Sequence, residues 1–407
     1  MTLRMCTGFL TNPMRPDVMM IGLRSIGSGQ GGVEAHVDHL TRELDALGLR
    51  VEVVTRSPYQ SERMTRGHAT SVVPVWSPRA TALEALVHSA LATLRAAWRR
   101  PVILHIHAIG PSLMAPFARL LGLKVVVTHH GEDYAREKWG RTGKRMLRLG
   151  EWCGARFAHA RIVVSSSLAE RLSQSFKVPF FYLPNGVSVR GPVAGTGTLK
   201  AFGLEPGKYI LNVSRIVPEK RQLDLIDALG QLGRDDMKLL LVGSADHESD
   251  YSRTVNARAN AHPQVVLAGF QTGQPLAELF SHAGAFALPS SHEGLPIALL
   301  EAMAYGNPVV ASAIEANRNV ALPAHCYVPC ADVPALSAAL ARALNEGAGG
   351  KRIDWSNLIA QYSWPDIAER TAAIYHEVDS SVGMRTLPGM IRPNPGREGV
   401  SQAVKNV

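Results

Sequence analysis

The chain is predicted to fold into two α/β domains, each built on a doubly wound parallel sheet. It has 407 residues, which is too long for one ordinary domain. Short apolar runs rich in Val, Ile and Leu alternate with amphipathic helical patterns, as parallel sheets with crossover helices require. This alternation occurs in two series, and a stretch that contains Gly and Pro but few large apolar residues, 185–198, separates them.

The expected strands are short, and most are followed by a loop or helix. The first series opens with a strand over residues 17–24, a glycine-rich loop over 27–32 and an amphipathic helix over 33–47. Its further strands are expected at 49–55, 102–107, 124–128 and 161–165. The strands of the second series are expected at 209–214, 238–243, 265–268, 285–288 and 308–311. Open parallel sheets bind ligands at the carboxyl ends of their strands, so we expect the site in a cleft between the two domains.

These patterns divide the chain into six parts. They are an N-terminal leader over residues 1–16, a first domain over 17–190, a linker over 191–204, a second domain over 205–364, a crossover helix over 365–382 and a disordered tail over 383–407. The tail is expected to be disordered because it is rich in Gly and Pro and poor in residues that build a core.

The composition is that of a soluble globular protein, with 46% hydrophobic and 19% charged residues. No run of 18 apolar residues occurs, so no membrane span is predicted. Residues 1–16 include Arg4 and Arg15 and lack a continuous apolar core, which argues against a secretory signal. The four cysteines are scattered, and Cys326 and Cys330 lack a second pair, so we expect no zinc site and a reduced setting.

Positive charge is concentrated in the first half of the chain. Residues 1–200 contain 26 Lys and Arg against 13 Asp and Glu, whereas residues 201–407 contain 17 against 21. The net charges are therefore +13 and −4. Such asymmetry indicates that the first half meets an anionic partner, such as a membrane surface, a lipid-linked diphosphate or nucleic acid.

The segment 291–312, SHEGLPIALLEAMAYGNPVVAS, carries the strongest functional signal. Pro296 stands at the expected first residue of a helix of good helix formers. A helix N-terminus offers free N–H groups and partial positive charge, and so favours a phosphate or diphosphate. Glu293 lies just before this end and Glu301 about a turn and a half inside it. The two carboxylates can therefore reach opposite ends of a bound diphosphate ligand.

This segment resembles the Glu-x7-Glu signature of retaining glycosyltransferases with the GT-B fold, most closely those of glycosyltransferase family 4. In that family the first Glu contacts the donor sugar and the second binds the ribose of the nucleotide. The resemblance implies these roles for Glu293 and Glu301 and assigns Gly294 and Leu295 to the same donor site. It covers most of residues 17–378, and it implies two facing Rossmann-like domains with a C-terminal helix that returns to the first domain.

The glycine-rich loop GSGQGG, residues 27–32, follows the first strand and opens a helix. Glycine allows unusual φ values and a close approach of the backbone to phosphate oxygens. The GxGxxG spacing alone is weak evidence, because a tight turn without a ligand matches it equally well. The longer string GGVEAHVDHL resembles the GGVE segment of family 4. This resemblance implies that the backbone of Gly31 and Gly32 closes over the donor phosphate and leaves room for the acceptor.

A basic pair follows the first strand of the second series in NVSRIVPEKR, where Arg215 and Lys220 are five residues apart. Two cations at this place would neutralise charge that develops on a diphosphate leaving group, although such a pair also fits a solvated loop. The segment resembles the Arg-x4-Lys pair of family 4, which binds the donor diphosphate. Arg221 stands where the family commonly has Gly, which puts the backbone geometry of this loop in question.

A strand over 125–127 leads into THHGEDYAREKWGR, which resembles the His-Gly loop of family 4. The His of that loop lies near the donor sugar, so the resemblance implies this role for His130, with Asp133 facing the acceptor. His105 and His107 alternate with apolar residues along an earlier strand, and His107, nearer its end, is the better candidate for the cleft. A structural role in the core is the alternative for each of these histidines.

Gly269 and Phe270 end another strand, at a position where family 4 enzymes hold the nucleotide base through backbone groups; Phe270 fits a plain core position equally well. No Asp-x-Asp triplet occurs, so the metal clamp of the other major glycosyltransferase fold has no obvious ligands. We expect neither a metal ion nor another cofactor. The helix end at Pro296, with Arg215 and Lys220, is expected to neutralise the diphosphate instead.

Two segments of the first half, 81–100 and 136–148, bear on binding partners. The first predicts a helix with one apolar side that ends in Arg99 and Arg100. The second contains six Lys or Arg against one Glu, with Trp139 among them. Both fit contact with an anionic membrane surface, and both also fit ordinary surface helices.

We interpret the sequence as a retaining, metal-independent hexosyltransferase with Glu293, His130, Arg215 and Lys220 as the residues that carry the reaction. The expected substrates are a UDP- or GDP-sugar and a glycan or lipid-linked acceptor in surface polysaccharide synthesis, because IGLRSIGSGQGGVEAHVDHL resembles exopolysaccharide-assembly enzymes. The protein is expected in the cytoplasm, at the inner face of the plasma membrane. Glu293 and Glu301 do not fit a glycosidase pair, since that mechanism needs carboxyls that flank one bond.

Three other classes of protein stay open at this point. A nucleotide-sugar epimerase of the same architecture would keep the donor site but need no acceptor. An NAD-dependent oxidoreductase would use the glycine loop, but it predicts an acidic residue at the end of the next strand, where Thr55 and Arg56 stand. A non-catalytic nucleotide-sugar binder is the third. Nucleic-acid binding is not expected, because no recognised binding motif accompanies the basic charge.

Overall fold

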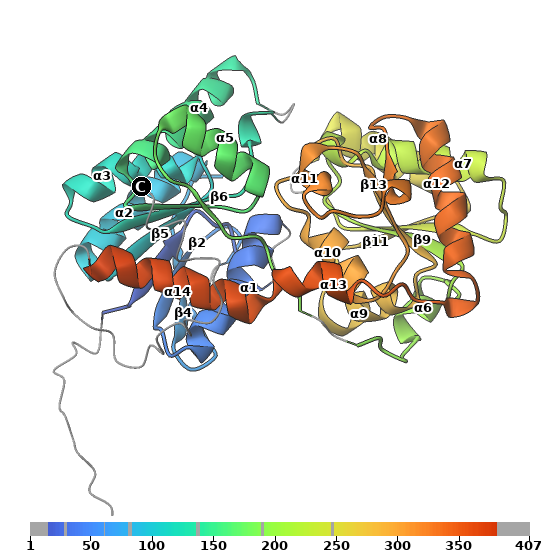
Figure 1. Ribbon diagram of the computed structural model, residues 1–407, viewed down its shortest axis with the longest axis horizontal. Coiled ribbons are helices and arrows are strands. Elements are labelled where there is room, and N and C mark those ends of the chain that lie inside the picture. The colour runs from blue at the N-terminus through green and yellow to red at the C-terminus, as the bar shows by residue number, and fades with distance from the viewer. Residues whose placement is uncertain are drawn as a thin grey trace, which may run out of the picture.

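The computed structural model describes residues 15–27, 31–60, 62–79, 84–135, 139–188, 191–245 and 248–380. Almost all of the expected leader, the middle of the loop 27–32 and the whole expected tail 383–407 lie outside these ranges. The described chain forms two α/β domains that lie side by side (Figure 1). The prediction of two α/β domains with parallel sheets is confirmed.

The first domain is built on an eight-stranded sheet with the order β3-β4-β2-β1-β5-β6-β7-β8. All neighbouring strands are parallel except β3 and β4. The strands are Val18–Ile21 (β1), Val51–Arg56 (β2), Met64–Arg66 (β3), Thr70–Val75 (β4), Ile103–His107 (β5), Val125–His129 (β6), Ala160–Val163 (β7) and Phe181–Tyr182 (β8). The expected strands all appear, and β3, β4 and β8 are additional.

The second domain is built on a six-stranded sheet with the order β11-β10-β9-β12-β13-β14, in which all pairs are parallel. Its strands are Tyr209–Val213 (β9), Lys238–Val242 (β10), Val265–Gly269 (β11), Ala285–Leu288 (β12), Val309–Ser312 (β13) and Tyr327–Val328 (β14). Only β14 is absent from the sequence prediction.

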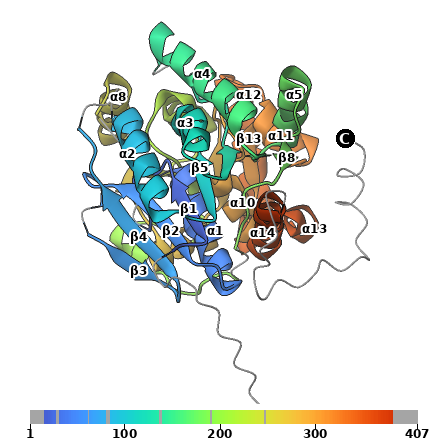
Figure 2. The same cartoon turned by 90° about the vertical axis from the view of Figure 1, so that its left-hand side faces the viewer.

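Helices cover both faces of each sheet (Figures 1 and 2). In the first domain they are Gly32–Ala46 (α1), Glu84–Arg99 (α2), Ala115–Leu120 (α3), Arg141–Phe157 (α4) and Ser166–Phe176 (α5). In the second they are Gly197–Ala201 (α6), Gln222–Leu232 (α7), Asp250–Ala261 (α8), Gly273–His282 (α9), Ile297–Ala304 (α10), Glu315–Arg318 (α11), Val333–Glu346 (α12) and Ser356–Ile359 (α13). The last helix is Trp364–Ser380 (α14).

Strand β1 shows why its sequence is a continuous apolar run. Val18 and Met20 belong to one buried cluster, whereas Met19 and Ile21 belong to the cluster on the opposite face. Successive side chains of a strand point to opposite faces, and a parallel sheet covered by helices on both sides buries both of them. The same pattern explains the other strands that the sequence predicts.

Helix α14 packs on the first domain, although it follows the second domain in the chain. Its residues Ile367, Ala372 and Tyr375 lie in the core cluster that also contains Leu40 of α1, and Figure 1 shows α14 running across the lower part of the first domain. The chain therefore crosses between the domains twice. The crossings lie together, since the Val187 N–H donates to the Tyr362 carbonyl at 2.7 Å.

The second domain begins inside the range 191–204, which the sequence predicts to be a linker. Helix α6 falls inside this range and packs against α9. Leu199 of α6 is completely buried and belongs to the core of the second domain, as does the buried Leu204. The apolar residues of this stretch are few, which is why the sequence pattern resembles a linker, but these two are enough to anchor it.

Acid is expected to destabilise the fold through His88, a fully buried residue of α2 whose Nε2 donates to the Thr55 carbonyl at 3.1 Å. Burial, helped by the charge of Arg56, lowers the pKa of His88 to about 4 from 6.5. The unfolded chain therefore takes up a proton at pH values where the folded chain does not. Stability that is full above pH 6.5 is lost as the pH falls towards 4, by about 1.4 kcal/mol per pH unit.

Urea unfolding at pH 7 and pH 4.5 measures this effect. The loss of unfolding free energy between the two pH values should be about 2 kcal/mol smaller in His88→Gln than in the wild type. His68→Gln, a change at an exposed histidine, is the control and should behave as the wild type. An equal loss in His88→Gln and the wild type would show that His88 is not the responsible group.

Candidate active site

A cleft of about 1200 Å³ lies between the two domains, and residues of both form its walls. Many of these residues directly follow the carboxyl ends of strands. Gly22 and Ala108 follow β1 and β5 of the first sheet, and Ser214, Gly243 and Phe270 follow β9, β10 and β11 of the second. This is the place at which open parallel sheets bind ligands.

The structure brings almost all the predicted site residues together in this cleft. Those that line it are Gly31, Gly32, His130, Arg215, Lys220, Phe270, Glu293, Gly294, Leu295 and Glu301. Gly269 is not among the lining residues. Its backbone has a φ of +63° and its carbonyl accepts from the Gly243 N–H at 2.7 Å, which directs the 40% exposed Phe270 to the cleft wall.

Lys220 and Glu293, both of the second domain, form an ion pair in the wall of the cleft. Lys220 Nζ lies 2.5 Å from Glu293 Oε1, and the two side chains are only 16% and 9% exposed. The loops that carry them are joined by a backbone hydrogen bond from Ser291 N–H to the Glu219 carbonyl at 2.8 Å. The pair therefore holds one cation and one carboxylate in fixed positions in the cleft that Arg215 also lines.

Arg221 adopts the left-handed conformation, with φ 54° and ψ 41°. This explains why glycine is common at this place in family 4, because a left-handed residue other than Gly is disfavoured by about 1–2 kcal/mol. Here the Arg221 side chain compensates in part, since its Nε donates to Asp224 Oδ2 at 2.6 Å in the first turn of α7. The substitution thus leaves the turn after Lys220 intact.

Helix α10 begins one residue later than the sequence predicts. Pro296 has φ −77° and ψ 104° and is the N-cap residue rather than the first helical residue. Its carbonyl accepts from the N–H groups of Leu299 and Leu300 at 3.2 and 3.3 Å. Glu301 lies in the second turn of α10 and lines the cleft, so the N-terminus of α10 faces the same space as both carboxylates.

The two domains touch at the His130–Gly131 and Glu293–Gly294 segments. A Cβ atom placed on Gly294 would lie 1.9 Å from the His130 carbonyl oxygen, and one placed on Gly131 would lie 3.2 Å from the Gly294 Cα. Real Cβ atoms do not approach that closely, so glycine at 294 permits the contact. Gly131 also has a φ of +133°, which favours glycine for a second reason.

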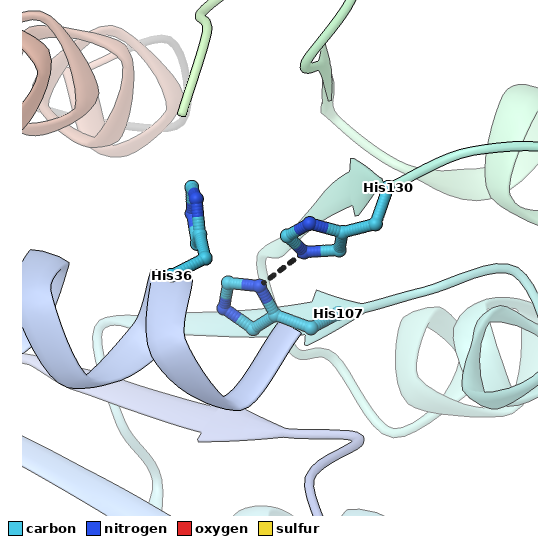
Figure 3. Close-up of side chains that lie close together, drawn as sticks. All are labelled: His36, His107 and His130. Atoms are coloured by element: carbon cyan, nitrogen blue, oxygen red, sulfur yellow. Dashed lines mark hydrogen bonds between the residues drawn. The ribbon is translucent and has the colours of Figure 1, made fainter. Parts of the chain in front are cut away.

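Three histidines gather under this contact. His36 comes from α1, His107 is the last residue of β5, and His130 follows β6 (Figure 3). His107 Nδ1 lies 3.1 Å from His130 Nε2. His36 and His107 are buried and His130 is partly exposed. His107 therefore does not line the cleft itself but supports His130 from below.

Hydrogen bonds determine the tautomer of His36. Asn185 Nδ2 donates to the Leu295 carbonyl at 2.7 Å, which fixes the orientation of the amide. Asn185 Oδ1 lies 2.9 Å from His36 Nδ1, and an amide oxygen can only accept. His36 therefore donates through Nδ1, and its Nε2 keeps a free lone pair. Asn185 thus links α1 to the loop of the second domain that contains Leu295.

All three imidazoles are neutral at neutral pH. Burial lowers the pKa of His36 to about 4. Burial also lowers the pKa of His107 and of His130 well below the ordinary value of 6.5, and neighbouring imidazoles add to the effect. His130 can therefore accept or donate a hydrogen bond in the cleft without carrying a charge.

His105 is held away from the cleft. Its Nδ1 lies 2.6 Å from the Tyr375 hydroxyl and its Nε2 2.7 Å from the Thr128 hydroxyl. Both ring nitrogens have partners inside the core, so His105 has the structural role that the sequence left open. Asp133 and Trp139, by contrast, line the first-domain side of the cleft.

The fold has close counterparts among solved structures. Sucrose-phosphate synthase from Thermosynechococcus elongatus superposes with a TM-score of 0.76 at 21% identity, covering 90% of this chain and 100% of that one. HepE from Anabaena in complex with UDP and glucose superposes with a TM-score of 0.70 at 18% identity, covering 88% and 99%. The two domains and their arrangement are therefore those of the GT-B fold.

Related sequences agree with this class. A GDP-mannose-dependent monoacylated α-(1-6)-phosphatidylinositol monomannoside mannosyltransferase from Corynebacterium glutamicum is 28% identical over 289 residues, which is 65% of this chain and 73% of that protein. The MMP α-(1→4)-mannosyltransferase of Mycolicibacterium hassiacum is 26% identical over 411 aligned positions, covering 86% and 96%.

Two family models match, one in each domain. The model for Glycosyltransferase Family 4 matches residues 30–190, and that for Glycosyl transferases group 1 matches residues 200–360. The chain is therefore a GT-B glycosyltransferase of the family 4 type, and the resemblance noted from its motifs is confirmed. It acts with a nucleotide-sugar donor. The alternative that the chain is an NAD-dependent oxidoreductase is therefore excluded.

Sequence reasoning did not assign His36 or Asn185. His36 stands inside the GGVEAH string, four residues after Gly32, so its place in the motif was a usable signal. Asn185 is 149 residues from His36 and 110 from Leu295, and no local pattern connects positions so far apart. Only the fold brings these residues together.

Proposed function

We propose that this glycosyltransferase moves a hexose from a UDP- or GDP-sugar to a glycan or lipid-linked acceptor, with retention of configuration and without a metal ion. The observation that carries the proposal is the Lys220–Glu293 ion pair in a cleft that Arg215 and the N-terminus of α10 also line. Cations and a helix end are the groups that bind a diphosphate, and a fixed carboxylate next to them suits the sugar that the diphosphate carries.

We propose one orientation of the donor in this cleft. Arg215, Lys220 and the N-terminus of α10 would hold the diphosphate, and Glu301, one turn into the helix, would bind the ribose. Phe270, exposed at the end of β11, would lie beside the base. The sugar would then lie between Glu293 and His130, where the two domains touch.

The chemistry follows from that placement. As the bond from the sugar to the diphosphate breaks, negative charge builds on the leaving group, and fixed cations that are already in place stabilise it without reorganisation. The acceptor hydroxyl would attack from the face that the diphosphate leaves. Relatives are named for α-linked products, and an α-linked donor yields an α-linked product only through retention.

Thermal unfolding with nucleotides tests the donor site. UDP, GDP, ADP and NAD are compared without metal, beside a Glu301→Ala variant. A ligand at about a hundred times its dissociation constant adds about 2.7 kcal/mol to the unfolding free energy. We expect UDP or GDP to stabilise the wild type and to lose this effect in Glu301→Ala. Stabilisation by NAD alone, or by UDP and GDP equally in both proteins, would contradict the assignment.

Product analysis separates transfer from epimerisation. The protein is incubated with the donor that the nucleotide screen selects, with and without a glycan or lipid-linked acceptor. Transfer predicts that nucleoside diphosphate is released faster when the acceptor is present. An epimerase would convert the sugar while it stays on the nucleotide and would release none.

We further propose that the first domain rests on an anionic membrane at the cytoplasmic face, where it meets a lipid-linked acceptor. Helices α2, α3 and α4 lie together on one side of the domain (Figure 2), and α3 contacts both of the others. Large apolar side chains are exposed on all three helices: Leu94, Trp98, Phe117, Leu120, Leu149 and Trp152. None of the described helices is both long and apolar enough to cross a membrane.

Charge complements this apolar surface. Arg100, Arg119, Arg145 and Arg148 are exposed on or beside the same helices, and Arg100 Nη1 donates to the Leu121 carbonyl at 2.8 Å. That bond places the ends of α2 and α3 side by side. Apolar side chains surrounded by arginines are the pattern of a surface that inserts shallowly between anionic headgroups.

Vesicle sedimentation tests the membrane surface. The protein is expected to sediment with anionic vesicles at low salt, to detach at high salt and to ignore neutral vesicles. A Trp98→Ser, Leu120→Ser double variant should bind at least about tenfold more weakly, because each large apolar side chain contributes about 1.5–3 kcal/mol when fully buried. Leu47→Ser, at another exposed leucine, is the control. Equal sedimentation of both variants would contradict this surface.

A further inference from the structure

We infer that His36, His107 and His130 form a binding site for one transition-metal ion of the Zn²⁺ class. One ring nitrogen of each residue lies within 4.8 Å of those of the other two. The three side chains converge from α1, β5 and the loop after β6 (Figure 3). This is the only such group of potential ligands in the part of the chain that the structure describes.

The spacing suits metal coordination. A tetrahedral zinc ion with bonds of about 2.1 Å to nitrogen places its ligand atoms about 3.4 Å apart, and His107 Nδ1 and His130 Nε2 are already 3.1 Å apart. The His36 ring meets the His130 ring edge to face, with centroids 4.8 Å apart. The three ligand nitrogens lie within 4.8 Å of one another, so they must approach by at most about 1.4 Å to reach the spacing of a tetrahedral zinc site.

His36 has the second-shell partner that metal-binding histidines typically have. Its Nδ1 donates to Asn185 Oδ1, which leaves the Nε2 lone pair for a ligand. A histidine that donates its other ring N–H to a fixed oxygen is held in the tautomer and orientation that coordination needs. Asn185 is itself fixed by its bond to the Leu295 carbonyl.

The His107 side chain has a single hydrogen-bond contact in the described part of the chain, and that contact is with His130. The residue is completely buried, and its Nε2 has no hydrogen-bond partner among the described residues. His107 Nδ1 and His130 Nε2 face each other as two imidazole nitrogens, and an ion bound between them would replace this single contact with two coordinate bonds.

The ligand types select the kind of ion. Three imidazoles and no carboxylate favour Zn²⁺, Co²⁺, Ni²⁺ or Cu²⁺ over Mg²⁺ and Ca²⁺, which prefer oxygen. His130 borders the cleft, so water or a substrate oxygen can reach the remaining coordination position. Structural zinc sites have four protein ligands, whereas this site has three and leaves one position open to water or substrate.

Loading this site should inhibit the enzyme, a consequence that rests on the proposed function. An ion between the three rings would hold the His130 ring by Nε2, the nitrogen that already faces His107, and would fix the orientation of this ring beside the donor sugar. It would also add positive charge at the contact between the His130 and Gly294 loops. The predicted role of metal in this protein is therefore inhibition, which is compatible with turnover that needs none.

Binding is tested with Co²⁺ and Zn²⁺ on the full chain, without a polyhistidine tag and after treatment with a chelator. Calorimetry and the visible absorption of bound Co²⁺ should show one ion per chain. His107→Gln and His130→Gln should each weaken binding at least about tenfold, since loss of even a second-shell partner typically costs about 10- to 100-fold. His292→Gln, at another histidine of the cleft, is the control and should bind as the wild type.

The metal-binding measurements test the site independently of the proposed function, because neither donor nor acceptor takes part in them. Binding that is absent in the wild type, or equal in the wild type and both variants, would overturn the site. Thermal unfolding of each metal-free variant checks that the chain is folded, and His130→Gln, at the partly exposed position, keeps the test valid if His107→Gln does not fold. With the site established, Zn²⁺ should slow donor turnover at least tenfold and a chelator should restore it. An unchanged rate would overturn the inhibitory role.

Discussion

Replacing Glu293 by Gln is expected to lower kcat about 100-fold while leaving the dissociation constant of the nucleoside diphosphate nearly unchanged. Glu293 is only 9% exposed and its Oε1 lies 2.5 Å from Lys220 Nζ. Gln keeps the shape and an acceptor oxygen that can still face Lys220, but it removes the charge that, in the proposed arrangement, orients the sugar. Misplacement of a reacting group by about 1 Å costs about 10² in rate, whereas in the proposed arrangement other residues hold the base, the ribose and the diphosphate.

Two measurements establish that result. Release of nucleoside diphosphate from the donor gives kcat and KM, and calorimetry with UDP or GDP gives affinity. Glu205→Gln removes a charge from an exposed position of the same domain and is the control. A variant with normal kcat would refute the role of Glu293 in the reaction, and a variant that lost nucleotide affinity alone would move Glu293 to the nucleotide site.

A double-mutant cycle distinguishes the two contributions of Glu293. If part of its effect is to hold Lys220 in place, then Lys220→Met and Glu293→Gln together should cost clearly less than the sum of the two single changes. Full additivity would mean that each residue contacts the donor independently, and that the ion pair has no catalytic consequence.

The sequence predicted the strands that are buried on both faces and failed at the strands that are not. Strands such as β1 and β6 are continuous apolar runs because helices cover both of their sides. Strand β3, at the edge of the sheet, is polar and largely exposed. Strand β4 contains Pro74, which argues against a strand in any sequence pattern. The two-residue strands β8 and β14 are too short to show a period.

The site could be predicted where its chemistry is local and not where it depends on folding. Lys220 and Glu293 each lie in a short string directly after a strand, so their motifs reveal them one at a time. They pair with each other because strands β9 and β12, which precede them, are neighbours in the sheet. The contact between Gly294 and the His130 carbonyl depends on how the two domains meet, and no string of residues encodes it.

Replacing Gly294, at the contact with the His130 carbonyl, by Ala should lower turnover at least about 100-fold. The added Cβ would lie 1.9 Å from the His130 carbonyl oxygen. A carbon and a carbonyl oxygen come no closer than about 3.3 Å, so the two loops must separate by about 1.4 Å. The nearest obstacle is backbone, which cannot rotate away as the end of a flexible side chain can. His130 and Glu293 flank the contact, and a shift of that size misplaces them relative to one sugar.

The same substitution should affect nucleotide binding far less, because the collision is with the His130 carbonyl of the first domain, whereas Lys220, Glu301 and Phe270 lie on other segments of the second domain. Kinetics should therefore show a fall in kcat, while calorimetry with UDP or GDP shows nearly normal binding. Gly230→Ala, whose Cβ would meet nothing within 4 Å, is the matched control. If Gly294→Ala turned over at the wild-type rate, the closed contact between the two domains would not be the catalytic arrangement. If Gly230→Ala fell equally, general loss of stability rather than domain contact would be the cause.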